Sequence, residues 1–170
     1  MATPQPGRGP ARAALAAGAV GYAAAWGLAW ARFPARVPVH FGAGGEVDRY
    51  ADRGSALVGF AVLGVVLTAL FVVLACAGSR VPTTWLNLPH RDHWLATPER
   101  ERQVRAMMAV DLAALGAATL VLLAALLTAT AVVSTDTDPR LGAPVAILVA
   151  VWLVLVLGYA VWCHRRRYRP

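Results

Sequence analysis

Lysine is absent from this chain of 170 residues, and all sixteen basic side chains are arginine. Acidic residues are few as well: nine Asp and Glu leave a net charge of +7. Charged residues make up 15% of the chain and hydrophobic residues 58%, which excludes the composition of an ordinary soluble domain. The positive charge does not indicate nucleic-acid binding, because the arginines cluster at the ends of apolar runs, where the positive-inside rule places them.

Motifs for catalysis are also missing from the sequence. It has no glycine-rich phosphate loop, no G-x-S-x-G elbow and no H-E-x-x-H motif. The two cysteines, Cys76 and Cys163, form no Cys-x-x-Cys motif. Both fall at helix ends that we expect on the reducing side of the membrane, so we expect thiols and no disulfide. These absences predict a protein that is not an enzyme and has no cofactor or bound metal.

Four apolar runs are long enough to cross a bilayer, which takes about 20 helical residues. They cover residues 13–31, 56–77, 107–133 and 144–163. The third helix should begin earlier, because Thr97, Pro98 and Glu99 provide an N-cap, a first-turn proline and a first-turn acid. A cleaved signal peptide is the rival interpretation of the first run, and its length disfavours it. The sequence therefore predicts an all-α integral membrane four-helix bundle in one domain, residues 1–170.

The arginines also predict the orientation in the membrane. With the N-terminus inside, eleven arginines fall on the cytoplasmic side and five on the outer side. This bias favours a multi-pass protein of the cell membrane with both termini in the cytoplasm. Residues 33–54 would then form an outer loop and residues 79–105 a cytoplasmic loop. The Ala- and Arg-rich composition suggests a bacterial coding sequence.

The outer loop gathers polar, aromatic and turn-forming residues between two apolar runs. Pro34 and Pro38 favour an extended chain over residues 33–39. The Gly42–Gly45 run then favours a tight reversal of the chain. Beyond the loop, Ser55 is the expected N-cap of the second helix.

The reversal would bring His40 back towards Glu46 and Asp48. One interpretation is a divalent-metal site or an acid–base group. The other is that His40 braces the turn through hydrogen bonds. We favour the second, because one histidine and two acids are too few ligands for a metal site.

The same loop resembles a known family. The string Phe33–Gly42 (FPARVPVHFG), followed by Gly45 and Asp48, is similar to the P-x-x-V-P-x-H-F…G…D signature of the domain of unknown function 1648. That domain also forms the N-terminal part of SdpI-type immunity membrane proteins. A second string, NLPHRDHWL at residues 87–95, resembles the N-x-P-x-x-x-x-W segment that follows the second membrane helix in many such proteins. The immunity members carry a further C-terminal segment that this sequence does not show.

The resemblance and the predicted turn together give the candidate functional residues. The candidate recognition loop consists of Pro34, Pro38, His40, Phe41, Gly42, Gly45 and Asp48. The candidate cytoplasmic motif consists of Asn87, Pro89 and Trp94. His90 and His93 flank Asp92 in this motif, but Pro89 predicts a structured loop, so we expect packing of Trp94 and no metal there.

Asp111 lies about one turn inside the third span. Acids within a membrane are costly and often functional. Asp111 either lines a polar path or accepts a hydrogen bond near the cytoplasmic surface, for example from Tyr159. The small residues of the first and third spans predict that these two helices form the tightest pair. The Leu- and Val-rich second and fourth spans should face lipid more.

The favoured function is therefore a non-enzymatic, immunity-like or signal-sensing accessory in the lipid bilayer. Its outer loop would recognise an extracellular peptide or a membrane protein partner, and nucleic acid is not expected as a partner. The alternative is a transporter or permease component with Asp111 lining a polar path. A hydrolase that uses His40 with Asp48 ranks last because the sequence offers it no nucleophile.

Overall fold

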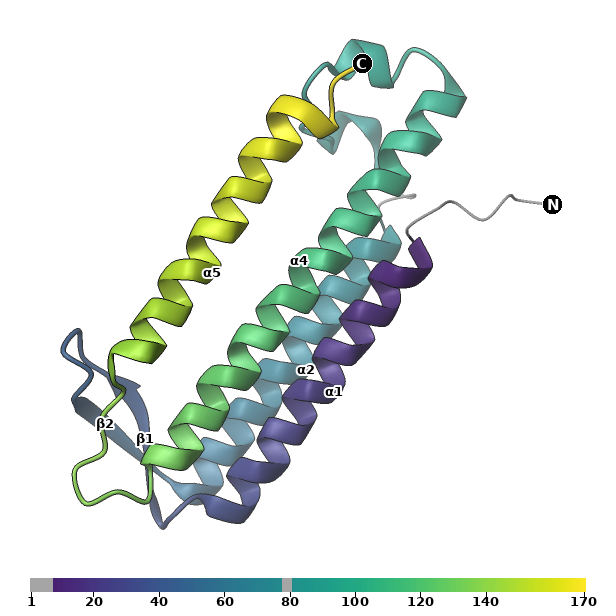
Figure 1. The fold of residues 1–170 in the computed structure, drawn as a ribbon. Helices are drawn as coiled ribbons and strands as arrows, with labels where there is room; N and C mark the ends of the chain where they lie inside the picture. Colours follow the sequence, from purple (N-terminus) through teal and green to yellow (C-terminus); the bar gives the residue numbers. More distant parts are fainter. Residues whose placement is uncertain (1–7, 78–80) are drawn as a thin grey trace.

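The computed structural model describes residues 8–77 and 81–170, and it is mostly helical (Figure 1). The long helices are α1 (Arg8–Arg32), α2 (Arg53–Ala77), α4 (Pro98–Val133) and α5 (Ala143–Trp162). Each is long and apolar enough to cross a membrane, which indicates a multi-pass membrane protein. The predicted all-α class needs a correction, because a two-stranded hairpin separates α1 from α2.

The hairpin consists of β1 (Arg36–Phe41) and β2 (Val47–Asp52), which pair antiparallel. The turn between them is closed by a hydrogen bond from the Gly45 N–H to the Gly42 carbonyl (2.9 Å). Gly45 has φ +84°, a conformation that L side chains rarely adopt. The predicted extended segment and the predicted reversal are both confirmed.

Three short elements complete the described chain. They are the 3₁₀ turn η1 (Thr83–Trp85), the helix α3 (Arg91–Trp94) and the π-helical turn η2 (Cys163–Arg167). They lie with the C-terminus and the start of α1 at one end of the molecule, which we call the terminal end (Figure 1). The hairpin lies at the opposite end. The sidedness of these ends in the membrane stays a prediction.

Helices α1 and α4 pack more closely than any other pair of long helices in the described part. At Gly18, a Cβ would lie 3.2 Å from the carbonyl oxygen of Ala117 and 3.3 Å from the Cβ of Leu120. At Gly116, a Cβ would lie 2.6 Å from the ring of Phe71 on α2. Small residues thus let the backbones approach, and the predicted tight pair of first and third spans is confirmed.

Helix α2 joins this pair through polar side chains of α1. The Tyr22 hydroxyl donates to the Phe60 carbonyl (2.7 Å), and the Trp26 indole donates to the Leu57 carbonyl (2.9 Å). Around them lies the larger apolar cluster. Its buried residues come from α1, the link that follows it, β1, α2 and α4, and they are Tyr22, Ala25, Ala29, Phe33, Val37, Ala56, Leu57, Leu127 and Ala131. The core therefore sits among three helices and reaches the base of the hairpin.

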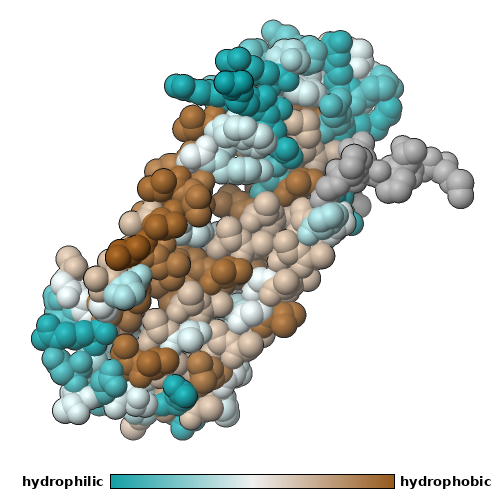
Figure 2. Space-filling view, viewed as in Figure 1, coloured by the Kyte–Doolittle hydropathy of each residue, from teal (hydrophilic) through white to brown (hydrophobic). Residues whose placement is uncertain are grey.

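Helix α5 is packed differently from the other three. It lies wholly in the described part of the chain, and none of its residues is buried. In mid-span it donates one hydrogen bond to α4, from the Trp152 indole to the Ala118 carbonyl (3.2 Å). Brown apolar side chains cover much of the molecule between its two polar ends (Figure 2). Helix α5 thus exposes most of its surface, as do Val58, Val62 and Val65 on α2, and that these surfaces face lipid stays a prediction.

Two helix starts were predicted from capping residues, and one prediction is wrong. Helix α4 begins as expected, with the Thr97 hydroxyl accepting from the Arg100 N–H (3.4 Å). Helix α2 begins at Arg53 and not after Ser55. The Asp52 carboxylate accepts the Ser55 N–H (2.9 Å), so Asp52 takes the capping role.

Candidate functional site

The hairpin presents one paired polar group to the solvent. His40 Nδ1 and Asp48 Oδ1 lie 2.6 Å apart, and their side chains are 59% and 50% exposed. The structure thus brings His40 to Asp48, as the turn predicts. Glu46 does not join them: its carboxylate folds over the turn, where a Cβ on Gly42 or Gly44 would meet it. No group of three metal-ligating side chains occurs among the described residues.

The remaining residues of the predicted recognition loop divide by burial. Pro38 and Gly45 are buried, so they shape the hairpin and contact no solvent. Pro34, Phe41 and Gly42 are partly exposed. The exposed surface of the hairpin therefore includes the His40–Asp48 pair, and its buried residues hold it on the core.

Hydrogen bonds lower the pKa of one carboxyl at the base of the hairpin. Asp52 ends β2, and the side chain and backbone N–H of Ser55 donate to its carboxylate. These bonds stabilise the charged form, so the pKa of Asp52 lies below its ordinary value. The charge at this N-cap is therefore retained at neutral pH.

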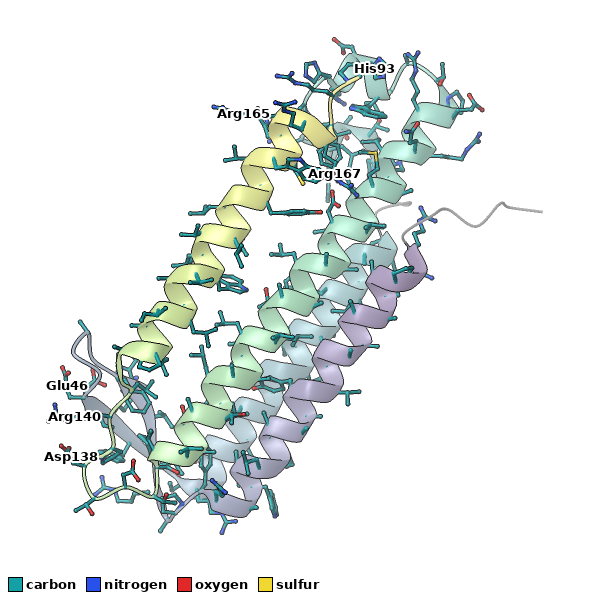
Figure 3. All side chains as sticks on the ribbon, in the orientation of Figure 1. Glu46, His93, Asp138, Arg140, Arg165 and Arg167 are labelled. Atoms are coloured by element: carbon teal, nitrogen blue, oxygen red, sulfur yellow. The ribbon has the colours of Figure 1, made fainter. Side chains whose placement is uncertain are left out.

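A second contact joins the hairpin turn to the segment that enters α5. The Leu141 N–H donates to the Gly45 carbonyl (2.9 Å), and Glu46 and Arg140 form an antiparallel bridge. A Cβ at Gly45 would overlap the carbonyl oxygen of Leu141. Figure 3 shows Glu46, Asp138 and Arg140 together at this end of the molecule. We call this the hairpin contact. Its partners lie about 95 residues apart in sequence, and no local sequence pattern predicts that they meet.

The terminal end carries the second polar group, the Asp111 cluster of Asp111, Tyr159, Arg167 and Tyr168. Asp111 Oδ1 accepts the Tyr159 hydroxyl (2.8 Å) and pairs with the Arg167 guanidinium (2.8 Å). Its Oδ2 accepts Arg167 Nε (2.9 Å) and the Tyr168 hydroxyl (2.6 Å). Two-point pairing of this kind is strong and directional.

The sequence predicted only part of this cluster. The hydrogen bond from Tyr159 was one of two alternatives for Asp111 and is present in the structure, whereas the contacts of Arg167 and Tyr168 with Asp111 were not predicted. The arginines after the fourth span indicate a basic stop at the membrane surface, and that pattern hides which one turns inward. Arg167 turns inward because it lies on the π-helical turn η2, which directs its side chain back towards α4 (Figure 3). In that position the side chain is 24% exposed.

The predicted cytoplasmic motif packs against the same tail. Trp94 is buried, and its indole donates to the Tyr168 carbonyl (3.0 Å). His93 contacts the Trp94 ring edge-on with centroids 5.2 Å apart. Asn87 is exposed and Pro89 partly buried in the loop before α3. The expected packing of Trp94 is confirmed, and the motif supports the C-terminal segment.

Burial raises the pKa of the Tyr168 hydroxyl in the C-terminal segment. Tyr168 is 8% exposed, and burial, followed by the hydrogen bond to Asp111, raises its pKa above the ordinary value. Tyr168 therefore stays a hydrogen-bond donor across the physiological pH range. A hollow of about 240 Å³ adjoins the cluster and is lined mainly by apolar side chains such as Met108, Leu115 and Val156.

Comparison with known proteins adds one match. Residues 17–65 match the family described as Domain of unknown function (DUF1648). The matched segment contains most of α1, the whole hairpin and the first half of α2, and so it includes His40 and Asp48. Neither a curated protein nor a solved structure matches the chain. The predicted resemblance to this domain is confirmed there, and the likeness to SdpI-type proteins stays a prediction.

Proposed function

We propose that this chain is a non-enzymatic membrane accessory that receives an extracellular peptide or a membrane protein partner at its hairpin, as an immunity or signal-sensing protein does. The observation that carries the proposal is the exposed His40–Asp48 pair on a hairpin that is bonded to the start of α5. The pair is exposed on a hairpin that contacts α2 and is also bonded to the segment that enters α5, the least packed long helix.

The strands supply a mode of recognition for a peptide. Within the described part of the chain, β1 and β2 pair only with each other, apart from the bridge between Glu46 and Arg140. A two-stranded sheet has open edges, and an extended peptide adds to such an edge through main-chain hydrogen bonds. Strand β2 is the more exposed strand, and Asp48 lies on it. The His40–Asp48 pair then supplies a charged contact for a basic or polar side chain of the peptide.

The hairpin contact supplies a route by which binding would affect the rest of the molecule. Gly45 and Leu141 bond directly, and α5 begins two residues after Leu141. At its other end α5 continues into η2 and the Asp111 cluster. A ligand that moves the hairpin turn therefore pulls on a helix whose far end is held by polar bonds at the terminal end.

Survival of a deletion strain in spent medium from its parent culture tests the proposal. The wild-type gene should restore survival, His40→Ala should fail to do so at equal membrane levels, and His164→Ala, an exposed histidine at the terminal end, should succeed. Survival of the deletion strain at the parental level across growth phases would contradict an immunity role. Equal rescue by His40→Ala would contradict recognition through the pair.

The transporter alternative requires Asp111 to face a polar path. Its side chain is 12% exposed, and both oxygens accept hydrogen bonds from Arg167 and tyrosines. The adjoining hollow is mainly apolar. These contacts support attachment of the C-terminal segment, so transport stays an unsupported alternative that solute-uptake assays of Asp111→Asn would test.

A further inference from the structure

A long apolar groove follows one face of the α1–α2 pair. It consists of two adjoining hollows of about 500 and 530 Å³, both lined by Trp26 and Ala61. The first begins at Arg53, and the second ends at Val72. At about 1.5 Å per helical residue, this stretch of α2 is about 28 Å long. The groove therefore covers nearly the depth of a bilayer's hydrocarbon core, about 30 Å.

The floor of this groove is formed in advance of any ligand. Small residues line it, namely Ala19, Ala23, Ala61, Gly64 and Ala69. The hydrogen bonds of Tyr22 and Trp26 to carbonyls of α2 hold the two helices at a fixed spacing. A Cβ at Gly64 would overlap the Tyr22 ring. The present spacing of α1 and α2 therefore requires glycine at this position. Each hollow has a volume within the range of ligand pockets, about 300–1,000 Å³.

The hairpin end of the groove has a positive charge. Arg53 is the one charged residue lining either hollow in the described part of the chain, and it is exposed. Its guanidinium donates one hydrogen bond to the Trp30 carbonyl (2.5 Å). Arginine has five N–H donors, so most remain for a ligand. The neighbouring acid, Asp52, is turned to the Ser55 N–H as the N-cap.

Two tryptophan side chains indicate where the hairpin end of the groove lies in the membrane. Trp30 is 56% exposed, and its ring lies 5.4 Å from the Trp26 ring between centroids. Exposed tryptophans at the end of a membrane helix typically lie at the headgroup level. Arg53 is thus at the depth of lipid phosphates, and the apolar groove extends from it towards the bilayer centre.

We propose that this groove binds one anionic phospholipid from the leaflet on the hairpin side. Arg53 holds the phosphate, since a guanidinium matches phosphate oxygens in two-point geometry. An acyl chain lies between α1 and α2 and covers the small residues of the floor. A partner helix of apolar residues fits the observations less well, because it would leave the Arg53 donors without an anion. The site is independent of the function proposed for the hairpin.

Native mass spectrometry of the purified protein tests the site. The full chain is reconstituted in equal amounts of phosphatidylglycerol and phosphatidylcholine and extracted in mild detergent. Wild type should retain one phosphatidylglycerol in about tenfold preference, because both lipids offer a phosphate to Arg53 but the choline cation of phosphatidylcholine offsets that charge. Arg53→Gln should bring the two lipids close to parity, and Arg53→Lys should keep most of the preference because it keeps the charge.

Two matched controls separate the site from general charge and general packing. Arg49→Gln removes one positive charge from the same end of the molecule, outside the groove, and should keep the wild-type preference. Ala61→Phe fills the point that both hollows share and should reduce retention of either lipid, whereas Val66→Phe, exposed on the same helix outside the lining, should not. Equal retention of both lipids by wild type, or equal effects of Arg53→Gln and Arg49→Gln, would overturn the proposal.

Discussion

The three helices α1, α2 and α4 and the fourth helix α5 are held by different kinds of contact. In the first group, glycines let the helix backbones approach closely. A Cβ at Gly18 of α1 would lie only 3.2 Å from the carbonyl oxygen of Ala117 on α4. In α5 no residue is buried, and apart from the mid-span hydrogen bond of Trp152 to Ala118 the helix is held mainly at its two ends. One end is the hairpin contact between Gly45 and Leu141, and the other is the Asp111 cluster.

This difference predicts how each group of helices responds to a local change. Close packing along a whole helix resists movement, because every residue must shift together. A helix fastened at its ends moves when either attachment changes. The central claim is therefore that α5 connects the hairpin to the terminal end, and that its two attachments depend on each other.

Removing the charge of Asp111 should have the largest effect. Asp111→Asn leaves the partly buried Arg167 without a counter-charge, which destabilises the fold by about 3 kcal/mol. Thermal or denaturant unfolding in detergent measures this loss. Arg167→Gln in the Asp111→Asn background should recover part of it, because the double variant leaves no unpaired charge. Equal unfolding of wild type and Asp111→Asn would show that the cluster does not hold α5.

Filling the α1–α4 contact should have the next largest effect. Gly18→Leu forces a side chain against the backbone of Ala117 and should cost about 1–3 kcal/mol of stability. Gly21→Leu is the matched control, three residues along the same helix, where a Cβ meets open space within the described structure. Unfolding of both variants in the same detergent compares them. A loss at Gly21→Leu as large as at Gly18→Leu would remove the argument that the contact is specific.

Acid should affect the start of α2 by a smaller amount. The lowered pKa of Asp52 means that its contribution to stability is complete above the unfolded value of about 3.9 and is lost as the pH falls through the folded value. Asp52→Asn keeps a good N-cap without the titrating charge, so its melting temperature should fall less between pH 6 and pH 3 than that of wild type. The start of α5 has no side-chain cap in the described structure and should not contribute to the difference. Identical pH profiles would contradict this role of Asp52.

The sequence predicted the features that local rules determine. The hydropathy of four runs gave the spans, and Thr97 with Pro98 gave the start of α4. Two prolines and the Gly42–Gly45 run predicted the extended segment and the reversal that bring His40 to Asp48, but not the pairing of two strands. Small residues gave the tight pair of helices.

The features that it did not predict are long-range or depend on competition between neighbours. The contact between Glu46 and Arg140 has no sequence signal, since each is one charged loop residue among several. Arg167 is one arginine in a basic run, and only the π-helical turn selects it for Asp111. Asp52 displaced Ser55 as the cap because the chain leaves β2 directly into helix.

Hydrogen–deuterium exchange of residues 163–170 tests the central claim most directly. Gly45→Ala disrupts the hairpin contact at the opposite end of α5, because the new Cβ overlaps the Leu141 carbonyl and Gly45 has a positive φ. Gly59→Ala, whose Cβ meets open space on α2, is the control. We predict faster exchange in residues 163–170 for Gly45→Ala and wild-type exchange for Gly59→Ala. Faster exchange confined to the hairpin and residues 136–142, with residues 163–170 unchanged, would contradict the claim that the two attachments of α5 depend on each other.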